Sequence, residues 1–247
     1  MKSEINVKYS DISELDTLDI YYPDKSNGKT FVYFHGGGFN SGDKADFWNI
    51  KLAESFTSKG FTFVSINYSL YPNTKFPQFL IEGAKAIKFI CNYLKDMHPY
   101  VSGQSAGSWL AMMLCYNTKY LLDEDINPLD IAGWVFESGQ ATSHFNLLEY
   151  EKGIDPLAQR IDEMAPLYFV NKNTNMSPAL FILYDNDMPN RYEQNKLLIK
   201  ATLNYNSNIK ITDILLHGTH CLASTSYNSD GEMGFVIEAI KWIKQNN

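Results

Sequence analysis

The stretch YVSGQSAGSWLAMM, residues 100–113, joins a short apolar run to a helical pattern through a turn of small residues. Ser105 stands in the middle of that turn, between Gly103 and Gly107. A sharp strand-to-helix turn exposes a serine hydroxyl at its tip, and glycines, which have no Cβ, let the strand and the helix approach closely. The helix that begins at Ala106 adds partial positive charge beside the hydroxyl. The stretch therefore predicts a nucleophilic Ser105, although turns of small residues also produce G-x-S-x-G by chance.

Strand-like and helix-like segments alternate on both sides of this turn. Apolar, β-branched and aromatic runs predict strands, and apolar residues at helical spacing predict helices. The alternation predicts an α/β chain with a mostly parallel sheet and helices on both faces, folded as a single domain over residues 1–247. The predicted strands are 5–9, 18–22, 31–34, 61–68, 100–102, 131–138, 179–184 and 209–217, and the predicted helices are 47–59, 78–95, one from 106, 191–203 and 235–243.

Composition and charge exclude several classes of partner. The 247 residues carry a formal net charge of -7 with no basic run, so nucleic acid and membrane surfaces are not expected as partners. The N-terminus lacks an apolar signal-peptide core, and no apolar run approaches the roughly 18 residues of a membrane helix, so a cytoplasmic location is expected. The cysteines Cys91, Cys115 and Cys221 are expected to be buried free thiols. No cysteine pair or histidine spacing suggests a metal, and no cofactor is expected.

A second glycine-rich segment follows the predicted strand 31–34. It reads His35-Gly36-Gly37-Gly38-Phe39. Three glycines leave backbone N–H groups free to point into a cavity, as in an oxyanion hole that binds the oxygen of a tetrahedral intermediate. The expected donors are the amides of Gly37, Gly38 and Ala106. His35 is expected to shape the loop and not to act as a base.

These two segments together resemble the α/β-hydrolase superfamily. HGGGF at 35–39, followed by GQSAG at 103–107, is most similar to the hormone-sensitive-lipase-like esterases, the small acetyl esterases and the kynurenine formamidases. NYSLYPNTKFPQFLIEGAKAIKFI at 67–90 looks like the family segment between oxyanion loop and nucleophile. The resemblance covers most of residues 18–245 and implies an α/β-hydrolase fold with a small or absent cap. Residues 139–178 are the only segment long enough to form that cap, and a short helix packed on the sheet is the alternative.

A serine nucleophile needs a base held by a carboxylate, and the chain order in this fold is Ser, acid, His. The resemblance implies Asp187 as the acid and His220 as the base. Asp185 and His217 compete with them, and Glu137 is a remote third acid. His98 and His144 are expected to be ordinary surface or loop residues, although His144 lies in the segment 139–178 that could cover the site.

The resemblance implies a serine carboxylesterase for small, short-chain esters. The chain departs from the family at Ser69, where arginine is usual, and at Gln104, so the subfamily and substrate stay open. An arylformamidase of the kynurenine type, a deacetylase of sugars or antibiotics, and a non-catalytic binding protein are the alternatives. The expected partner is a small ester, and a homodimer is left open because relatives are often dimers. The expected substrate contacts are Phe39, Gln104, Phe145 and Met188.

Overall fold

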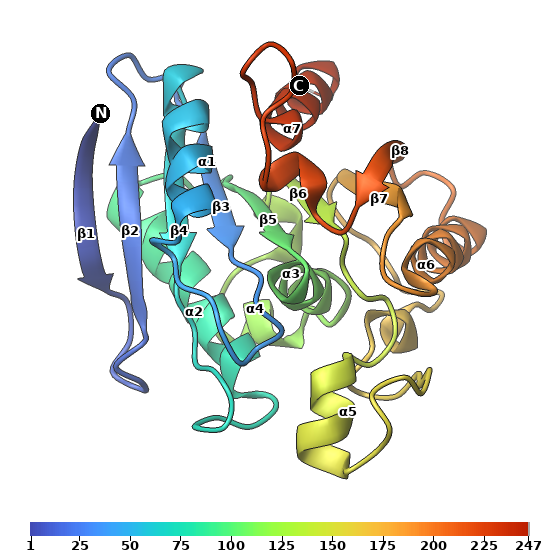
Figure 1. Cartoon of the computed structure of the whole chain (residues 1–247). Coiled ribbons are helices and arrows are strands. Elements are labelled where there is room, and N and C mark those ends of the chain that lie inside the picture. The colour runs from blue at the N-terminus through green and yellow to red at the C-terminus, as the bar shows by residue number, and fades with distance from the viewer. Residues whose placement is uncertain (247) are drawn as a thin grey trace.

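One eight-stranded sheet runs through the molecule, and the computed structural model describes residues 1–246 (Figure 1). The strands are β1 (Lys2–Lys8), β2 (Thr17–Tyr22), β3 (Thr30–Phe34), β4 (Thr62–Ile66), β5 (Tyr100–Gln104), β6 (Gly133–Glu137), β7 (Ala179–Asn186) and β8 (Ile211–Thr219). The helices are α1 (Phe47–Ser58), α2 (Gln78–Leu94), α3 (Ala106–Tyr116), α4 (Lys119–Asp123), α5 (Phe145–Lys152), α6 (Arg191–Tyr205) and α7 (Gly234–Gln245), with 3₁₀ turns η1 (Pro128–Asp130), η2 (Pro166–Phe169) and η3 (Leu222–Ser224).

The strand order is β1-β2-β4-β3-β5-β6-β7-β8. Strands β1 and β2 run antiparallel to their neighbours, whereas β4, β3, β5, β6, β7 and β8 are parallel to one another. The predicted mostly parallel sheet is therefore confirmed, with an antiparallel hairpin at its β1 edge. The carboxyl ends of the parallel strands meet at one edge of the sheet, where ligands of such sheets bind.

Helices cover both faces of the sheet, as the continuous apolar strands predicted. In β3, Val32 and Phe34 belong to the core that also contains buried residues of α2, α3 and α6. The alternate residues Phe31 and Tyr33 belong to a second core with buried residues of α1 and α7. Every residue of β3 is buried, because successive side chains point to opposite covered faces.

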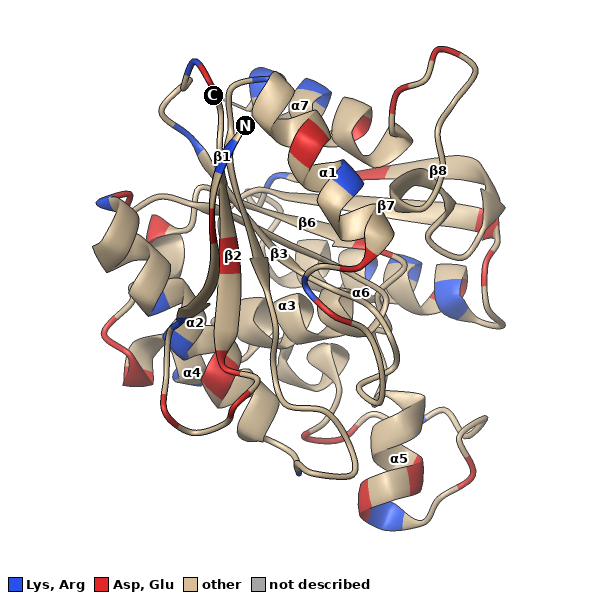
Figure 2. Ribbon diagram, turned by 60° about the vertical axis from the view of Figure 1, so that its left-hand side comes forward, with Lys and Arg blue, Asp and Glu red and all other residues tan. Residues whose placement is uncertain are grey.

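The segment 139–178 contains a feature that periodicity alone left undecided. It forms the short helix α5, which extends away from the sheet at the lower end of the molecule in Figures 1 and 2, and the turn η2. The five-residue helix α4 was not predicted from the sequence. Both helices are too short for an apolar period to stand out.

Charged residues are distributed over the outer helices and loops, and β3 in the middle of the sheet carries none (Figure 2). The three cysteines are free and buried, as the sequence predicted. Among residues 1–246, no helix combines the length and apolar character that crossing a membrane requires.

Candidate active site

Ser105 lies at the turn between β5 and α3, in a backbone conformation that residues other than glycine rarely adopt. Its φ is 52° and its ψ is -115°. A Cβ on Gly103 would overlap the Gly107 carbonyl, and a Cβ on Gly107 would overlap the carbonyl of Phe34. The amide of Ser105 donates to the carbonyl of Glu137 on the neighbouring strand at 2.9 Å. The two glycines and this hydrogen bond together hold the strained turn against the sheet.

His220 and Asp187 complete a hydrogen-bonded chain with Ser105. The imidazole Nε2 of His220 lies 2.9 Å from Ser105 Oγ, and its Nδ1 lies 2.5 Å from Asp187 Oδ1. Asp187 directly follows the last residue of β7, and His220 directly follows the last residue of β8. The structure therefore brings together the three residues that the sequence predicted, from three separate strand ends.

The Asp187 carboxylate is enclosed, with its side chain 3% exposed. Burial opposes its ionisation, but hydrogen bonds from His220, from the Ser138 hydroxyl and from the Met188 amide outweigh burial and lower its pKa. Ser138 Oγ donates to Oδ2 at 2.7 Å, and the Met188 amide donates to Oδ1 at 2.7 Å. An ionised carboxylate beside Nδ1 fixes the imidazole so that Nε2 faces the serine.

The competing aspartate and histidine pair with each other at the surface. Asp185 Oδ2 lies 2.7 Å from His217 Nδ1, and the His217 side chain is 95% exposed. The Gly218 amide donates to Asp185 Oδ1 at 3.0 Å. Neither residue is hydrogen-bonded to Ser105 in the part of the chain that the structure describes.

The remaining histidines and the third acid have other surroundings. His35 is buried, stacks on Tyr68 with ring centroids 4.5 Å apart, and its Nδ1 lies 2.6 Å from the Gly36 carbonyl of the glycine loop. His144 is fully buried, and its Nδ1 accepts from the Asn146 amide at the start of α5. His98 is exposed, and its Nδ1 lies 2.8 Å from the carbonyl of Asp130 in η1. Glu137 is fully buried and faces Tyr184.

The glycine loop is held in a left-handed backbone conformation. Gly37, Gly38 and Phe39 have φ values of 111°, 63° and 64°. The Gly37 carbonyl accepts the amides of Asn40 and Ser41, at 3.2 and 3.0 Å. Within residues 1–246, no protein acceptor is found for the Gly37 and Gly38 amides. Of the two residues, Gly37 lines the hollow over Ser105.

A hollow of about 370 Å³ lies over Ser105 and His220. Its wall combines polar and apolar groups, and Trp48 is the largest aromatic side chain in it. The sequence did not predict Trp48, Asp46 and Thr225 as lining residues. Asp46 and Trp48 lie only a few residues after the glycine loop, which was the available signal for them. The hollow is lined by His35, Gly36, Gly37, Ser41, Gly42, Asp46, Trp48, Asn49, Gln104, Ser105, His220, Cys221 and Thr225.

The four predicted substrate contacts are placed differently. Gln104 lines the hollow and accepts a hydrogen bond from the Tyr33 hydroxyl at 3.1 Å. Phe39 has no exposed surface and packs in the core, so it anchors the loop from behind. Phe145 is half-buried and stacks on His144. Met188 is 38% exposed and lines a separate hollow of about 320 Å³ beside Asp187.

No cluster of three or more histidine, cysteine, aspartate or glutamate side chains with metal-binding geometry occurs in residues 1–246. A hydroxyl, an imidazole and a carboxylate in hydrogen-bonded sequence are the groups that acyl transfer uses.

One family model and several curated acetyl esterases are similar to parts of this chain. The family model BD-FAE matches residues 18–135. The acetyl esterase of Salmonella typhi is 27% identical over 193 residues, which are 74% of this chain and 57% of that protein. The chain thus spans a little over half the length of the curated relatives it matches.

Solved structures match over nearly the whole chain. Esterase B from Lactobacillus rhamnosis has a TM-score of 0.78 at 18% identity, covering 99% of this chain and 85% of its own. A truncated carbohydrate esterase from gut microbiota has a TM-score of 0.79 at 17% identity, covering 100% and 96%. Thermogutta terrifontis esterase 2, phosphoramylated by tabun, has a TM-score of 0.79 at 17% identity, covering 98% and 94%. These likenesses establish a shared fold.

Proposed function

We propose that this chain, which has the α/β-hydrolase fold, is a serine esterase that hydrolyses small, short-chain carboxylic esters. The observation that carries the proposal is the chain of hydrogen bonds from Ser105 Oγ to His220 Nε2 and from His220 Nδ1 to Asp187. The esterases among its relatives and structural neighbours support the same activity. A binding protein would have no need of a complete set of nucleophile, base and acid.

In the proposed mechanism, His220 takes the proton of Ser105 as Oγ attacks the ester carbonyl. Asp187 stays ionised and stabilises the imidazolium that forms. The amides of Gly37, Gly38 and Ala106 are proposed to bind the negative oxygen of the tetrahedral intermediate. Donors of this kind contribute about 2.7–4 kcal/mol each in enzymes where one was removed.

His220 then gives the proton taken from Ser105 to the leaving alcohol, which completes the first half of the reaction and leaves the acyl group on Ser105. In the second half, water attacks the acyl-enzyme as His220 takes its proton; His220 returns the proton to Ser105 Oγ, and the carboxylic acid leaves. The proposed chemistry uses only groups of the chain itself.

Hydrolysis of p-nitrophenyl acetate and butyrate by the wild type and by Ser105→Ala tests the proposal. Loss of the nucleophile is expected to lower kcat by on the order of 10⁶. Ser58→Ala, an exposed serine at the end of α1, is the matched control and is expected to keep full activity. An organophosphate should add one phosphoryl group to the wild type, located on Ser105 by peptide mass mapping, and none to Ser105→Ala.

N-formylkynurenine is assayed alongside, because an arylformamidase would use the same residues. A kcat/KM for this amide far above that of any ester would replace the esterase proposal with the formamidase. Equal inactivity of the wild type and Ser105→Ala on all substrates would overturn the assignment of a hydrolase.

A further inference from the structure

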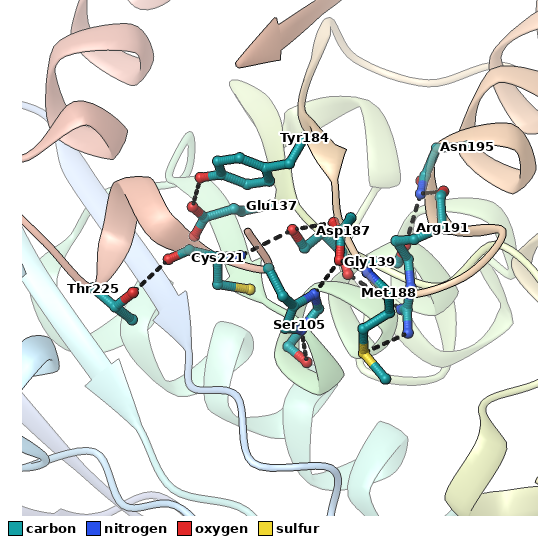
Figure 3. A network of polar contacts seen from close by, with 12 residues as sticks. Ser105, Glu137, Gly139, Tyr184, Asp187, Met188, Arg191, Asn195, Cys221 and Thr225 are labelled. Atoms are coloured by element: carbon teal, nitrogen blue, oxygen red, sulfur yellow. Dashed lines mark hydrogen bonds and ion pairs between the residues drawn. The ribbon is translucent and has the colours of Figure 1, made fainter. Parts of the chain in front are cut away.

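The loop that follows His220 is anchored by a buried glutamate and a tyrosine that take no part in the mechanism above. Tyr184 donates its hydroxyl proton to Glu137 Oε1 at 2.5 Å, as Figure 3 shows. The same Tyr184 oxygen accepts the amide of Ala223 at 2.7 Å, and Glu137 Oε1 accepts the amide of Ser224 at 3.2 Å. Two amides of the turn η3, only three and four residues after His220, therefore end on this pair.

The same glutamate also holds the nucleophile. Its backbone carbonyl accepts the amide of Ser105 at 2.9 Å, and it lies opposite Gln104 in the register of β5 and β6. The next residue, Ser138, donates to Asp187 and accepts the amide of Cys221 at 3.3 Å. Two residues at the end of β6, Glu137 and Ser138, thus contact the nucleophile, the acid and residues 221–224, here called the base loop.

The base loop is also held by local hydrogen bonds, in which the Ser224 and Thr225 hydroxyls donate to the Cys221 carbonyl at 3.2 and 2.8 Å. Cys221 has a φ of 59°, so the chain leaves β8 in a left-handed turn, and the first amides beyond it are received by side chains. A loop without strand pairing moves unless such acceptors fix it, and a displacement of about 1 Å at a catalytic group can cost about 10²-fold in rate. The acceptors on Glu137 and Tyr184 are therefore placed to set the position of the His220 imidazole.

We propose that Glu137 and Tyr184 are positioning residues for His220: together they hold the loop 221–224 so that the imidazole stays within hydrogen-bonding distance of Ser105. This inference rests on the proposed esterase function. It assigns to Glu137 a role distinct from that of the catalytic acid, since the carboxyl is hydrogen-bonded to Tyr184 and Ser224 and not to His220.

The ionisation of Glu137 gives the inference a second readout. Burial raises the pKa of this carboxyl to about 7, against the hydrogen bonds from Ser224 and Tyr184 that lower it. Its Oε2 has no hydrogen-bond partner among the described residues. A carboxylate accepts hydrogen bonds more strongly than a neutral carboxyl, so the loop is held more firmly above this pH than below it.

Other titratable groups surround Glu137, and they bear on this pH dependence. Asp187 raises the pKa of Glu137 through its negative charge. Tyr33 on β3, Tyr184 on β7 and Cys221 on the base loop all have pKa values raised, first by burial and then by the charge of Glu137, so they stay neutral through this range. Glu137 is thus the group in this set expected to change charge near pH 7.

The test compares Tyr184→Phe and Glu137→Gln with the wild type on p-nitrophenyl acetate between pH 5.5 and 9. Tyr184→Phe removes the hydroxyl that links Glu137 to Ala223, and is expected to lower kcat about 10-fold or more with KM changed less than about 3-fold. Glu137→Gln keeps an acceptor oxygen and is expected to retain kcat within about 5-fold at pH 8. Tyr116→Phe removes a buried hydroxyl bonded to Thr202 on α6 and is the matched control, expected to match the wild type.

The acid limb of log(kcat/KM) against pH separates positioning from a purely structural role. In the wild type this limb is expected to be steeper than in Glu137→Gln, because residue 137 can ionise only in the wild type. A thermal melt of each variant gives the folded fraction used to normalise kcat.

Three results would overturn the inference. The first is a folded Tyr184→Phe with the same kcat as Tyr116→Phe. The second is a Glu137→Gln variant whose acid limb is as steep as that of the wild type, which decides the matter even if Tyr184→Phe does not fold. The third is a wild type inert toward every ester, which overturns the proposed function and this inference with it, whereas an active wild type with unaffected variants overturns the positioning alone.

Discussion

At the scale of single residues, the chain offers two aspartate–histidine pairs of similar geometry and opposite surroundings. The Asp187 side chain is enclosed and that of His220 is mostly covered, whereas Asp185 and His217 are bonded to each other at the exposed surface. Hydrogen bonds that outweigh burial lower the pKa of Asp187, so it stays ionised at neutral pH. Asp187→Asn is therefore expected to lower kcat by about 10⁴-fold, as loss of the orienting carboxylate does in serine proteases.

Asp185→Asn is the matched control, because it makes the same chemical change two residues away. It is expected to leave kcat within about 2-fold of the wild type, since an exposed pair contributes little. Both variants are measured on p-nitrophenyl acetate at pH 8. The assignment of Asp187 as the acid is wrong if Asp185→Asn proves to be the slower enzyme.

A second residue-scale prediction concerns stability and not rate. The pKa of Glu137 is raised by burial from 4.5 to about 7. The folded chain then binds this proton more tightly than the unfolded chain, so the contribution of Glu137 to stability is fully present below about pH 4.5 and is lost as the pH rises through about 7. The loss corresponds to about 3 kcal/mol, since one pKa unit is about 1.4 kcal/mol.

Glutamine cannot ionise, so the free energy of unfolding of Glu137→Gln is expected to gain on that of the wild type as the pH rises from 5 to 8. Urea unfolding at several pH values measures the difference. A difference that stays constant over this range would show that Glu137 does not carry a raised pKa.

At the scale of elements, helix α5 is attached to the glycine loop. Asn146 Nδ2 donates to the Gly38 carbonyl at 2.5 Å, across 108 residues of chain. This hydrogen bond fixes the peptide next to the proposed oxyanion donors. The segment 139–178 therefore supports the glycine loop, in addition to any covering of the site. Asn146→Asp keeps the shape and removes the donor, and is expected to lower kcat about 10-fold with little change in KM.

Glu149→Ala, an exposed change on the same helix, is expected to behave as the wild type. Steady-state kinetics on p-nitrophenyl acetate, together with the rate of phosphonylation by an organophosphate, measure both variants. An Asn146→Asp variant that raises KM alone would mean that α5 binds substrate and does not brace the loop.

Sequence patterns predicted the features that neighbouring residues determine. They missed the features that depend on contacts between segments far apart in the chain. The strands, the turn at Ser105 and the glycine loop each have a local signature, and all are found in the structure. The burial of Phe39 and the contact of Asn146 with Gly38 depend on segments far apart in the chain, which no local period encodes. Residues alone left Asp185 and Asp187 open; the resemblance favoured Asp187, which the structure places against His220.

At the scale of the whole molecule, the size of the hollow follows from how three distant segments meet. Residues 36–49 after β3, 104–105 at the end of β5 and 220–225 after β8 enclose about 370 Å³ above Ser105. No single element determines that volume, so it could not be predicted from the sequence. A space this small favours short esters, and kcat/KM is expected to fall as the acyl chain or the alcohol lengthens.

Trp48 is the side chain through which this limit can be altered. It is half-buried against Phe47 and Tyr227 and lines the hollow. Trp48→Ala removes a large ring from the wall, so longer esters are expected to gain several-fold in kcat/KM relative to acetate, as one extra methylene is worth about 1–3 kcal/mol in an apolar pocket. Phe47→Ala removes the neighbouring ring, which is 61% exposed and lies outside the hollow, and should leave the preference unchanged.

Two substrate series locate the effect. One lengthens the acyl chain of p-nitrophenyl esters from acetate to decanoate, and the other lengthens the alcohol of alkyl acetates. A shift in one series for Trp48→Ala identifies which half of the ester lies against α1. If neither series shifts, or if Phe47→Ala shifts as much, the hollow over Ser105 does not set the size of the substrate.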